Sequence, residues 1–437
     1  MKDSKLGIRK WFSFIIAGLI GQLAWAIENN YLNVFVFDCT GDTKFMTWMT
    51  ITSAIAATVT TLFIGALLDR LGKRKIFVSI GYIIWGISII AFAFLDPRKP
   101  YNLVFSSALA SGITIVVMDC VMTFFGSTAN DAAFNAFVTD NTKPTNRGKV
   151  ESVLSIFPLI AGIAVILLQG ILVGAKQDGV ETNWLWFFVA FGALTTIIGV
   201  VCLFLLPKDT KLPNKEEPYL KNIVHGFRPK VIKERPELYL TLLTFMIFSI
   251  AIQIFMTYFM VYIQDVLKFD LVSTAGPILG TACVLTVVFG LFMDKIGKYK
   301  LVFGALSFGI IGAILLFFLQ QNIGVIIGGI ILMTGYLVAT AVLGAKIRDY
   351  TPEKETGLFQ GVRMVFVVMI PMIIGPLIGR AACYVDPHYA LNAYGEVTVL
   401  PNQYVFLFTA ITMVLVVIPL VFLLIRERKH GKENTTK

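Results

Sequence analysis

Long apolar runs dominate this sequence and limit what it can fold into. A helix needs about 20 residues to cross the hydrocarbon core of a bilayer, and we count twelve runs of about this length or longer. They lie at about residues 11–37, 45–68, 76–95, 104–139, 149–174, 184–206, 238–264, 271–293, 301–320, 323–345, 357–380 and 403–425. Charged residues make up only 15% of the chain, against about a quarter in soluble domains. The sequence therefore predicts an all-α membrane protein with twelve transmembrane helices.

The basic residues are distributed unevenly between the loops. The net charge is +10, and most of the 37 lysines and arginines fall before the first run, in alternate loops and in the tail. Lysine and arginine hold short loops in the cytoplasm, so this pattern indicates orientation in a membrane, and no nucleic-acid partner is expected. We predict a multi-pass protein of the cell membrane, surrounded by lipid, with both termini in the cytoplasm and acting as a monomer.

The residue types that build enzyme and metal sites are sparse and scattered. The five cysteines show neither metal-site spacing nor a disulfide pattern, and the three histidines fall in loops or the tail. The chain has no phosphate-binding loop and no cluster of catalytic residue types at a run's end. We therefore expect no enzymatic activity and no cofactor.

A long charged loop divides the runs into six and six. Residues 207–237 contain five prolines and much of the clustered charge. We expect an N-terminal half at 1–206, this loop on the cytoplasmic side, and a C-terminal half with the tail at 238–437.

Two short sequences recur at corresponding places in the two halves. GALLDRLGKRK (65–75) joins the second and third runs, and GLFMDKIGKYK (290–300) joins the eighth and ninth. DNTKPTNRG (140–148) and DYTPEKETG (349–357) follow the fourth and tenth runs. Parallel internal similarity of this kind is typical of transporters whose halves move about a binding site near the midplane.

An acidic residue within each basic repeat, Asp69 or Asp294, needs a positive partner, and the N-terminal end of a helix supplies one. The loop resembles the signature sequence of the major facilitator superfamily, of the type Gly-x-x-x-Asp-Arg-x-Gly-Arg-Lys. The resemblance implies transport of a small-molecule substrate and a clasp between the halves that stabilises the outward-open state. The residues expected in this conformational gate are Asp69, Arg70, Gly72, Lys73, Asp294, Gly297 and Lys298.

Few ionisable residues lie inside the runs, and each is a candidate for function because charge is costly there. In the fourth run, GSTANDAAFNAFVTD places Ser127, Asp131 and Asn135 at intervals of four on one helix face, with Asn130 beside them. Asp131 lies about 14 Å from Asp140 along the helix, near the midplane. We expect it to bind substrate or the coupling cation, sodium included; a buried structural pair is the alternative.

The first run contains a second group of polar residues. Gln22, Asn29 and Asn33 share a face and are expected to line the cavity, whereas Glu28 points at least about a quarter turn away, toward a neighbouring helix. A site role and a structural role both remain open for Glu28. We expect Asp119, in the fourth run, to be a hydrated residue near the outer rim.

Three further residues complete the candidate site. Arg363 lies about two turns into its run, where it either joins the site or extends to the inner surface. Trp25 and Tyr258 are candidates for stacking on a sugar ring, with helix packing as the alternative. Carboxylates without histidines suit coupling to a proton or to sodium.

A narrower resemblance covers about thirty residues. NDAAFNAFVTDNTKPTNRG and AKIRDYTP resemble the glycoside-pentoside-hexuronide:cation symporters, the melibiose-carrier branch. This implies cation-coupled import of a sugar or glycoside, with Asp131 as the carboxylate shared between sugar and cation. The chain lacks that branch's paired acids in the second span, where it reads TITSAIAATVTTL. The alternative is a proton-coupled exporter of amphipathic molecules, but the Gly-Pro pair usual in the fifth span of such exporters lies here in the eleventh, at 375–376.

Overall fold

The computed structural model is almost entirely helical and divides into two compact units. Unit 1 comprises residues 1–219 and 391–398, and unit 2 comprises residues 220–390 and 399–437. The structure describes residues 6–103, 107–142, 150, 153–154, 156–174, 182–209, 226–291, 297–351, 356–392 and 394–435.

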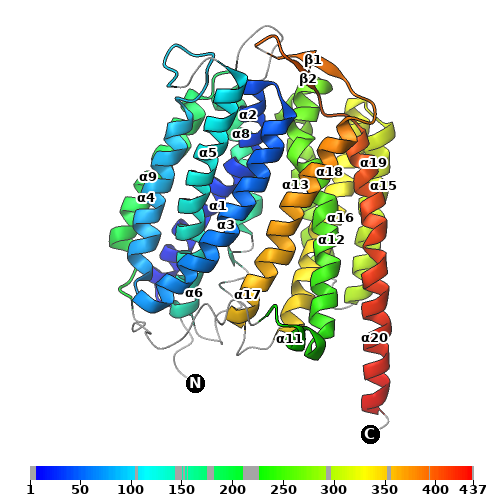
Figure 1. Ribbon diagram of the computed structural model, residues 1–437. Helices are drawn as coiled ribbons and strands as arrows, with labels where there is room; N and C mark the ends of the chain where they lie inside the picture. The colour runs from blue at the N-terminus through cyan, green and yellow to red at the C-terminus, as the bar shows by residue number, and fades with distance from the viewer. Residues whose placement is uncertain are drawn as a thin grey trace. The chain divides into compact units, whose positions relative to one another are not determined.

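The helices of unit 1 run alongside one another (Figure 1). They are α1 (Ile8–Asn30), α2 (Leu32–Thr40), α3 (Thr43–Leu71), α4 (Arg74–Phe92), α5 (Ala108–Gly126), the π-helix η1 (Ser127–Phe134), α6 (Asn135–Asn141), α8 (Phe157–Leu172) and α9 (Leu185–Leu205). Helix α5 continues through η1 into α6 without a break, so these three elements form one long rod.

Unit 2 contains most of the remaining elements. They are α11 (Pro229–Glu234), α12 (Pro236–Val261), η2 (Tyr262–Val266), α13 (Leu271–Leu291), α15 (Lys298–Phe318), α16 (Asn322–Tyr350), α17 (Thr356–Met364), η4 (Val365–Met369), α18 (Ile370–Cys383), α19 (Tyr404–Leu415) and α20 (Val417–Thr435). The short strands β1 (Tyr389–Leu391) and β2 (Val397–Val399) form a two-stranded sheet.

The expected membrane architecture is confirmed. In the described parts of the chain, eleven helices are long and apolar enough to cross a bilayer, and the shorter apolar helix Phe157–Leu172 falls where the fifth span was expected. Their bounds agree with the expected runs to within several residues. Hydrophobic length alone therefore places the helices.

The second glycine of each repeated loop has a positive φ, +67° at Gly72 and +89° at Gly297. Their ψ angles differ: Gly72, with ψ 12°, is in the left-handed helical region and ends α3, whereas Gly297, with ψ 135°, directly precedes α15. A positive φ costs glycine little, so both copies use this glycine for a backbone conformation that other residues rarely adopt.

Each repeated loop is also tied to the end of a later helix in its own unit. In unit 1, Arg74 Nε lies 3.1 Å from Asp140 Oδ2, and in unit 2 Lys298 pairs with Asp349. Asp140 and Asp349 open the second pair of repeated sequences. The two sequence repeats thus meet in space within each unit, which their separation along the chain did not predict.

Helices α4 and α9 approach closely through small residues. A Cβ added to Gly86 would lie 2.5 Å from the Gly192 carbonyl oxygen, and one added to Gly192 would lie 2.6 Å from the Gly86 carbonyl oxygen. Small residues at such crossings allow helix backbones to pack without intervening side chains.

We expect Gly86→Ala to destabilise unit 1, because the added methyl group has no space and overpacking costs about 1–3 kcal/mol. Thermal unfolding of the purified protein in detergent checks this, with Gly162→Ala in α8 as the control, since a Cβ at Gly162 meets nothing within 4 Å. Equal melting temperatures for the two variants would show that α4 and α9 can separate at little cost.

Candidate functional site

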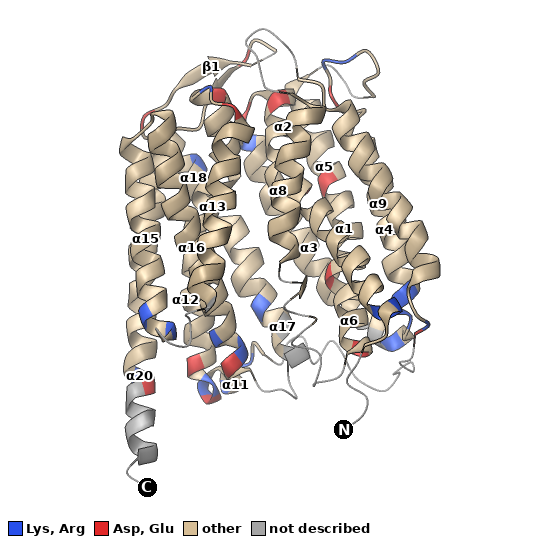
Figure 2. Ribbon diagram, turned by 180° about the vertical axis from the view of Figure 1, so that it is seen from behind, with Lys and Arg blue, Asp and Glu red and all other residues tan. Residues whose placement is uncertain are grey.

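Charged residues are concentrated at the helix ends, and few lie along the helices (Figure 2). In unit 1, the acidic residues within the spans include Glu28, Asp119 and Asp131. Glu28 belongs to α1, Asp119 to α5 and Asp131 to η1. The site is therefore built from α1 and the long α5–η1–α6 rod.

The rod carries a polar stripe in which every fourth residue is polar. In an α-helix, four residues turn about 40° beyond a full turn, so such a stripe drifts around the helix. The π-helix η1 has wider turns with i→i+5 hydrogen bonds, and this offsets the drift. The polar stripe consists of Asp119, Thr123, Ser127, Asp131 and Asn135.

Solvent exposure increases along the polar stripe toward α6. Asp119 is 1% exposed, and Thr123 and Ser127 are fully buried. Asp131 is half-buried, and Asn135 is exposed. The stripe therefore connects a buried carboxyl group to an accessible one.

Asp131 accepts hydrogen bonds from its own helical segment. Ser127 Oγ donates to Asp131 Oδ2 over 3.1 Å, and Asn130 Nδ2 donates to Asp131 Oδ1 over 3.3 Å. Within the described residues, Asp131 forms no ion pair with a lysine or arginine. Ser127 and Asn130 thus lie beside this carboxyl group, as their spacing in the fourth run indicated.

Asn130 is held in place by two other helices. The Tyr82 hydroxyl of α4 donates to Asn130 Oδ1 over 3.1 Å and to the Ala17 carbonyl oxygen over 2.8 Å. Gly21 of α1 faces the same amide, and a Cβ at Gly21 would overlap Asn130 Oδ1. The amide that supports Asp131 is therefore fixed by close contacts on both sides.

Trp25, a residue of α1, lies beside Asp131 of η1. Its half-buried indole interacts with the Asp131 carboxyl group and packs against Trp85, with the ring centroids 5.1 Å apart. Gln22 is half-buried, and the exposed Asn29 donates from Nδ2 to the Trp25 carbonyl oxygen. An aromatic face and amide groups thus accompany the carboxyl group.

Asn33 does not share this environment. Helix α1 ends at Asn30, and Asn33 lies in α2, 8% exposed, with its Oδ1 lacking a hydrogen-bond partner among the described residues. Gln22, Asn29 and Asn33 therefore do not form one uniformly accessible face, because the helix is interrupted at Tyr31.

Glu28 faces neighbouring helices, as its position on α1 indicated. It is 7% exposed, and its Oε1 accepts hydrogen bonds from Ser53 of α3 over 2.7 Å and from Thr123 of α5 over 2.8 Å. The expectation that Asp119 is hydrated at the outer rim is wrong, since Asp119 is 1% exposed. On the polar stripe, the Asp119 side chain faces the interior of unit 1.

The two candidates in unit 2 have different surroundings. Tyr258 is fully buried, and its hydroxyl donates to the Pro376 carbonyl oxygen over 2.8 Å, while its ring packs against Gly379. Arg363 is half-buried, forms no ion pair with the described residues, and experiences the charge of Arg348. Tyr258 thus contributes to packing between α12 and α18, and Arg363 is the more accessible of the two.

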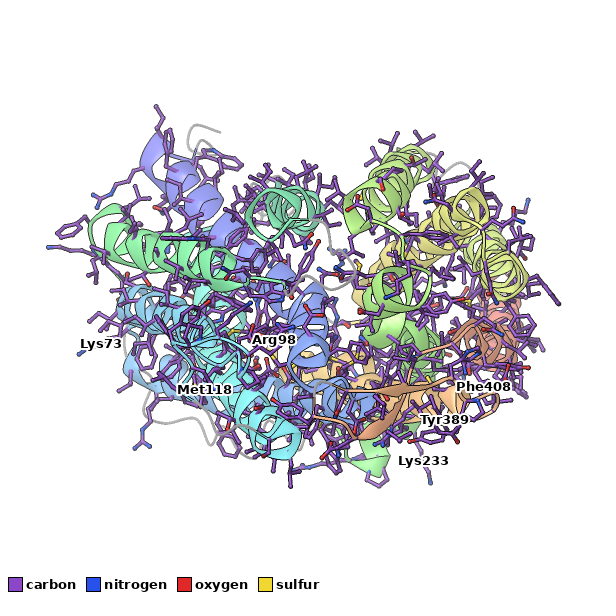
Figure 3. All side chains as sticks on the ribbon, turned by 90° about the horizontal axis from the view of Figure 1, so that it is seen from above. Lys73, Arg98, Met118, Lys233, Tyr389 and Phe408 are labelled. Carbon is purple, nitrogen blue, oxygen red and sulfur yellow. The ribbon has the colours of Figure 1, made fainter. Side chains whose placement is uncertain are left out.

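The gate residues are only partly described. Arg70 is exposed, and Lys73 is also exposed and points outward from unit 1 (Figure 3). The Asp69 side chain and all of Asp294 lie outside the described residues. Sequence reasoning missed Arg74, which is 2% exposed and pairs with Asp140; its place in the repeat beside Lys73 was the available signal.

Comparisons with known proteins agree with this architecture. A bacterial homologue of the human lysosomal transporter Spinster is 14% identical, with a TM-score of 0.71 over 98% of this chain and 99% of that one. The nucleoside transporter NupG is 11% identical, with a TM-score of 0.68 over 94% and 99%. The E. coli xylose transporter XylE is 14% identical, with a TM-score of 0.67 over 94% and 95%. At sequence identities this low, the similarity to these structures concerns the fold alone.

No curated protein sequence matches the chain. The family model of the Major Facilitator Superfamily matches residues 11–376 and, in a second match, residues 281–437. These matches extend through both sets of helices and both repeated loops. The chain therefore belongs to the Major Facilitator Superfamily and is a membrane transporter of that family.

Proposed function

We propose that this transporter imports a sugar or glycoside together with a proton or a sodium ion by alternating access. The observation that carries the proposal is the half-buried Asp131, which has no basic partner among the described residues and is flanked by Asn130, Ser127 and Trp25. A carboxyl group within a membrane span is costly unless it is neutralised. A coupling cation at this position lowers that cost.

The groups around Asp131 fit a polar ring-shaped substrate. Amide and hydroxyl groups offer donors and acceptors to sugar hydroxyls, and the Trp25 indole offers an apolar face. Ligand sites typically combine aromatic surface with a few convergent polar groups in this way. That nucleoside and xylose transporters share the fold is compatible with such a substrate.

Asp131→Asn should fold normally, because the change is nearly isosteric, but should abolish uphill accumulation, since an amide cannot exchange a proton or offset a bound cation. Uptake into reconstituted vesicles, with panels of labelled sugars and imposed proton or sodium gradients, measures this. Asp270→Asn is the charge-matched control, since among the described residues the Asp270 carboxylate accepts a hydrogen bond from Ser273 N at the start of a helix. Accumulation by the Asp131 variant would place the cation elsewhere.

For orientation, we propose that both termini and residues 207–237 face the cytoplasm. In a variant without the five native cysteines, cysteines introduced at positions 215 and 431 should resist impermeant thiol reagents in intact cells, whereas one at 178 should react. The charge distribution is the physical reason. Labelling at 215 from outside would overturn both the orientation and the assignment of this segment as the loop between halves.

The sequence repeat further predicts a gate at Asp69. If each repeat acid stabilises a helix N-terminus, its charge contributes up to about 2 kcal/mol, enough to shift two states by about thirtyfold. Asp69→Asn should therefore slow transport and favour the inward-open state without lowering folded yield, and Asp294→Asn should do so more weakly. Cysteine accessibility at the two mouths of the transport path reports the shift. Normal transport with unchanged accessibility would mean that the repeat only forms turns.

A further inference from the structure

Unit 1 contains a second group of acidic and hydroxyl side chains, one that the proposed sugar site does not use. Glu28 of α1, Ser53 of α3, and Asp119 and Thr123 of α5 meet where these three helices pack together. Their exposed fractions are 7%, 6%, 1% and 0%. Asp119 and Thr123 lie on the buried part of the polar stripe, about three and about two helical turns from Asp131 respectively.

Most of the acidic oxygens in the cluster lack a hydrogen-bond partner in the part of the chain that the structure describes. The Ser53 and Thr123 hydroxyls both donate hydrogen bonds to Glu28 Oε1, and the two hydroxyl oxygens lie 2.9 Å apart. Among the described residues, Glu28 Oε2 and both Asp119 oxygens form no hydrogen bond. Ser53, whose hydroxyl donates to Glu28 Oε1, also interacts with the Asp119 carboxyl group. Buried polar groups are normally satisfied, so three acidic oxygens that have no hydrogen bond among the described residues point to the binding of a positive species.

The surroundings add negative charge and no positive charge. Glu28 acts electrostatically on Asp119, and Asp131 acts on Glu28. No lysine or arginine in the described residues acts on either acid. Burying two unmatched carboxylates costs several kcal/mol per ion, so the cluster needs a cation from solution.

The ligand set limits which cation fits. All available groups are oxygens, which suits hard cations, but Ca²⁺ takes 6–8 oxygen ligands and Mg²⁺ usually keeps several waters. Two carboxyl groups and two hydroxyls in a fully buried position supply neither arrangement. A small monovalent species, either Na⁺ or a proton, requires fewer ligands.

We propose that Glu28 and Asp119, with the Ser53 and Thr123 hydroxyls, form a binding site for one monovalent cation, Na⁺ or a proton, distinct from Asp131. The role of this site rests on the proposed symport, because it supplies a second cation position besides the one proposed at Asp131. Ser127 lies between Thr123 and Asp131 along the polar stripe, and Asp131 acts electrostatically on Glu28, so occupancy of one site changes the electrostatic cost at the other.

Cation binding is tested on the purified full-length protein, without transport. In the sodium arm, the melting temperature is followed at alkaline pH as NaCl replaces choline chloride at constant ionic strength. A sodium site raises the melting temperature with ion concentration. Asp119→Asn should abolish this dependence, and Thr123→Val should raise the half-saturating Na⁺ concentration severalfold, since one neutral oxygen ligand is lost.

In the proton arm, infrared difference spectra between acidic and alkaline pH are recorded without Na⁺. A protonated carboxyl group gives a C=O stretching band, which Asp119→Asn or Glu28→Gln should remove. Asp38→Asn is the matched control in both arms, because Asp38 is a buried acid of unit 1 whose Oδ2 already accepts hydrogen bonds from Thr182 and Trp184.

The proposal is overturned if Asp119→Asn and Glu28→Gln leave both the sodium dependence and the carboxyl band unchanged. Should these variants fail to fold, Ser53→Ala and Thr123→Val decide the matter: unchanged half-saturation and an unchanged protonation midpoint refute the site. Intact cation binding without sugar uptake would reject the transport proposal alone, whereas sugar accumulation without binding at the buried acids would reject this site alone.

Discussion

An ionised carboxyl group in an apolar helix bundle must be hydrogen-bonded or neutralised, and the arrangement of unit 1 follows from how that demand is met. Asp131, the most accessible of the three acids, receives hydrogen bonds on both oxygens. Glu28 is buried and receives them on one. Asp119 is buried most deeply and receives none from the described residues. Hydrogen bonding thus decreases as burial increases, the reverse of what stability alone would favour.

The glycines around η1 explain how this arrangement is held. Gly21 of α1 makes room for the Asn130 amide, Gly81 of α4 lies against Ala129, and Gly126 at the end of α5 lies against the Trp85 ring. Three close contacts therefore surround one π-helical segment. Because side chains larger than hydrogen would push the helices apart at these points, the acids are positioned by backbone packing as much as by their own hydrogen bonds.

Hydrophobic length predicted the helices because the cost of exposing polar backbone in a bilayer outweighs local propensity. The polar stripe was only partly predicted: Ser127, Asp131 and Asn135 were recognised by their spacing, but Asp119 was placed at the rim. Depth along a helix does not reveal which neighbours cover a side chain. The π-helix and the Arg74–Asp140 pair were missed, since the first has no distinctive sequence and the second joins distant segments. The boundaries of the two halves and the gate at Asp69 remain predictions.

The π-helical segment has a consequence for how this chain tolerates changes in length. One residue removed from the rod while η1 keeps its wide turns would rotate α6 by about 100° relative to α5. Every side chain beyond the deletion would then face a different neighbour, even though no residue type had changed. A compensating insertion elsewhere in the rod would restore the facing of α6 but not the shared face of Thr123 and Asp131. In this helix, the number of residues is therefore constrained as strictly as their identity.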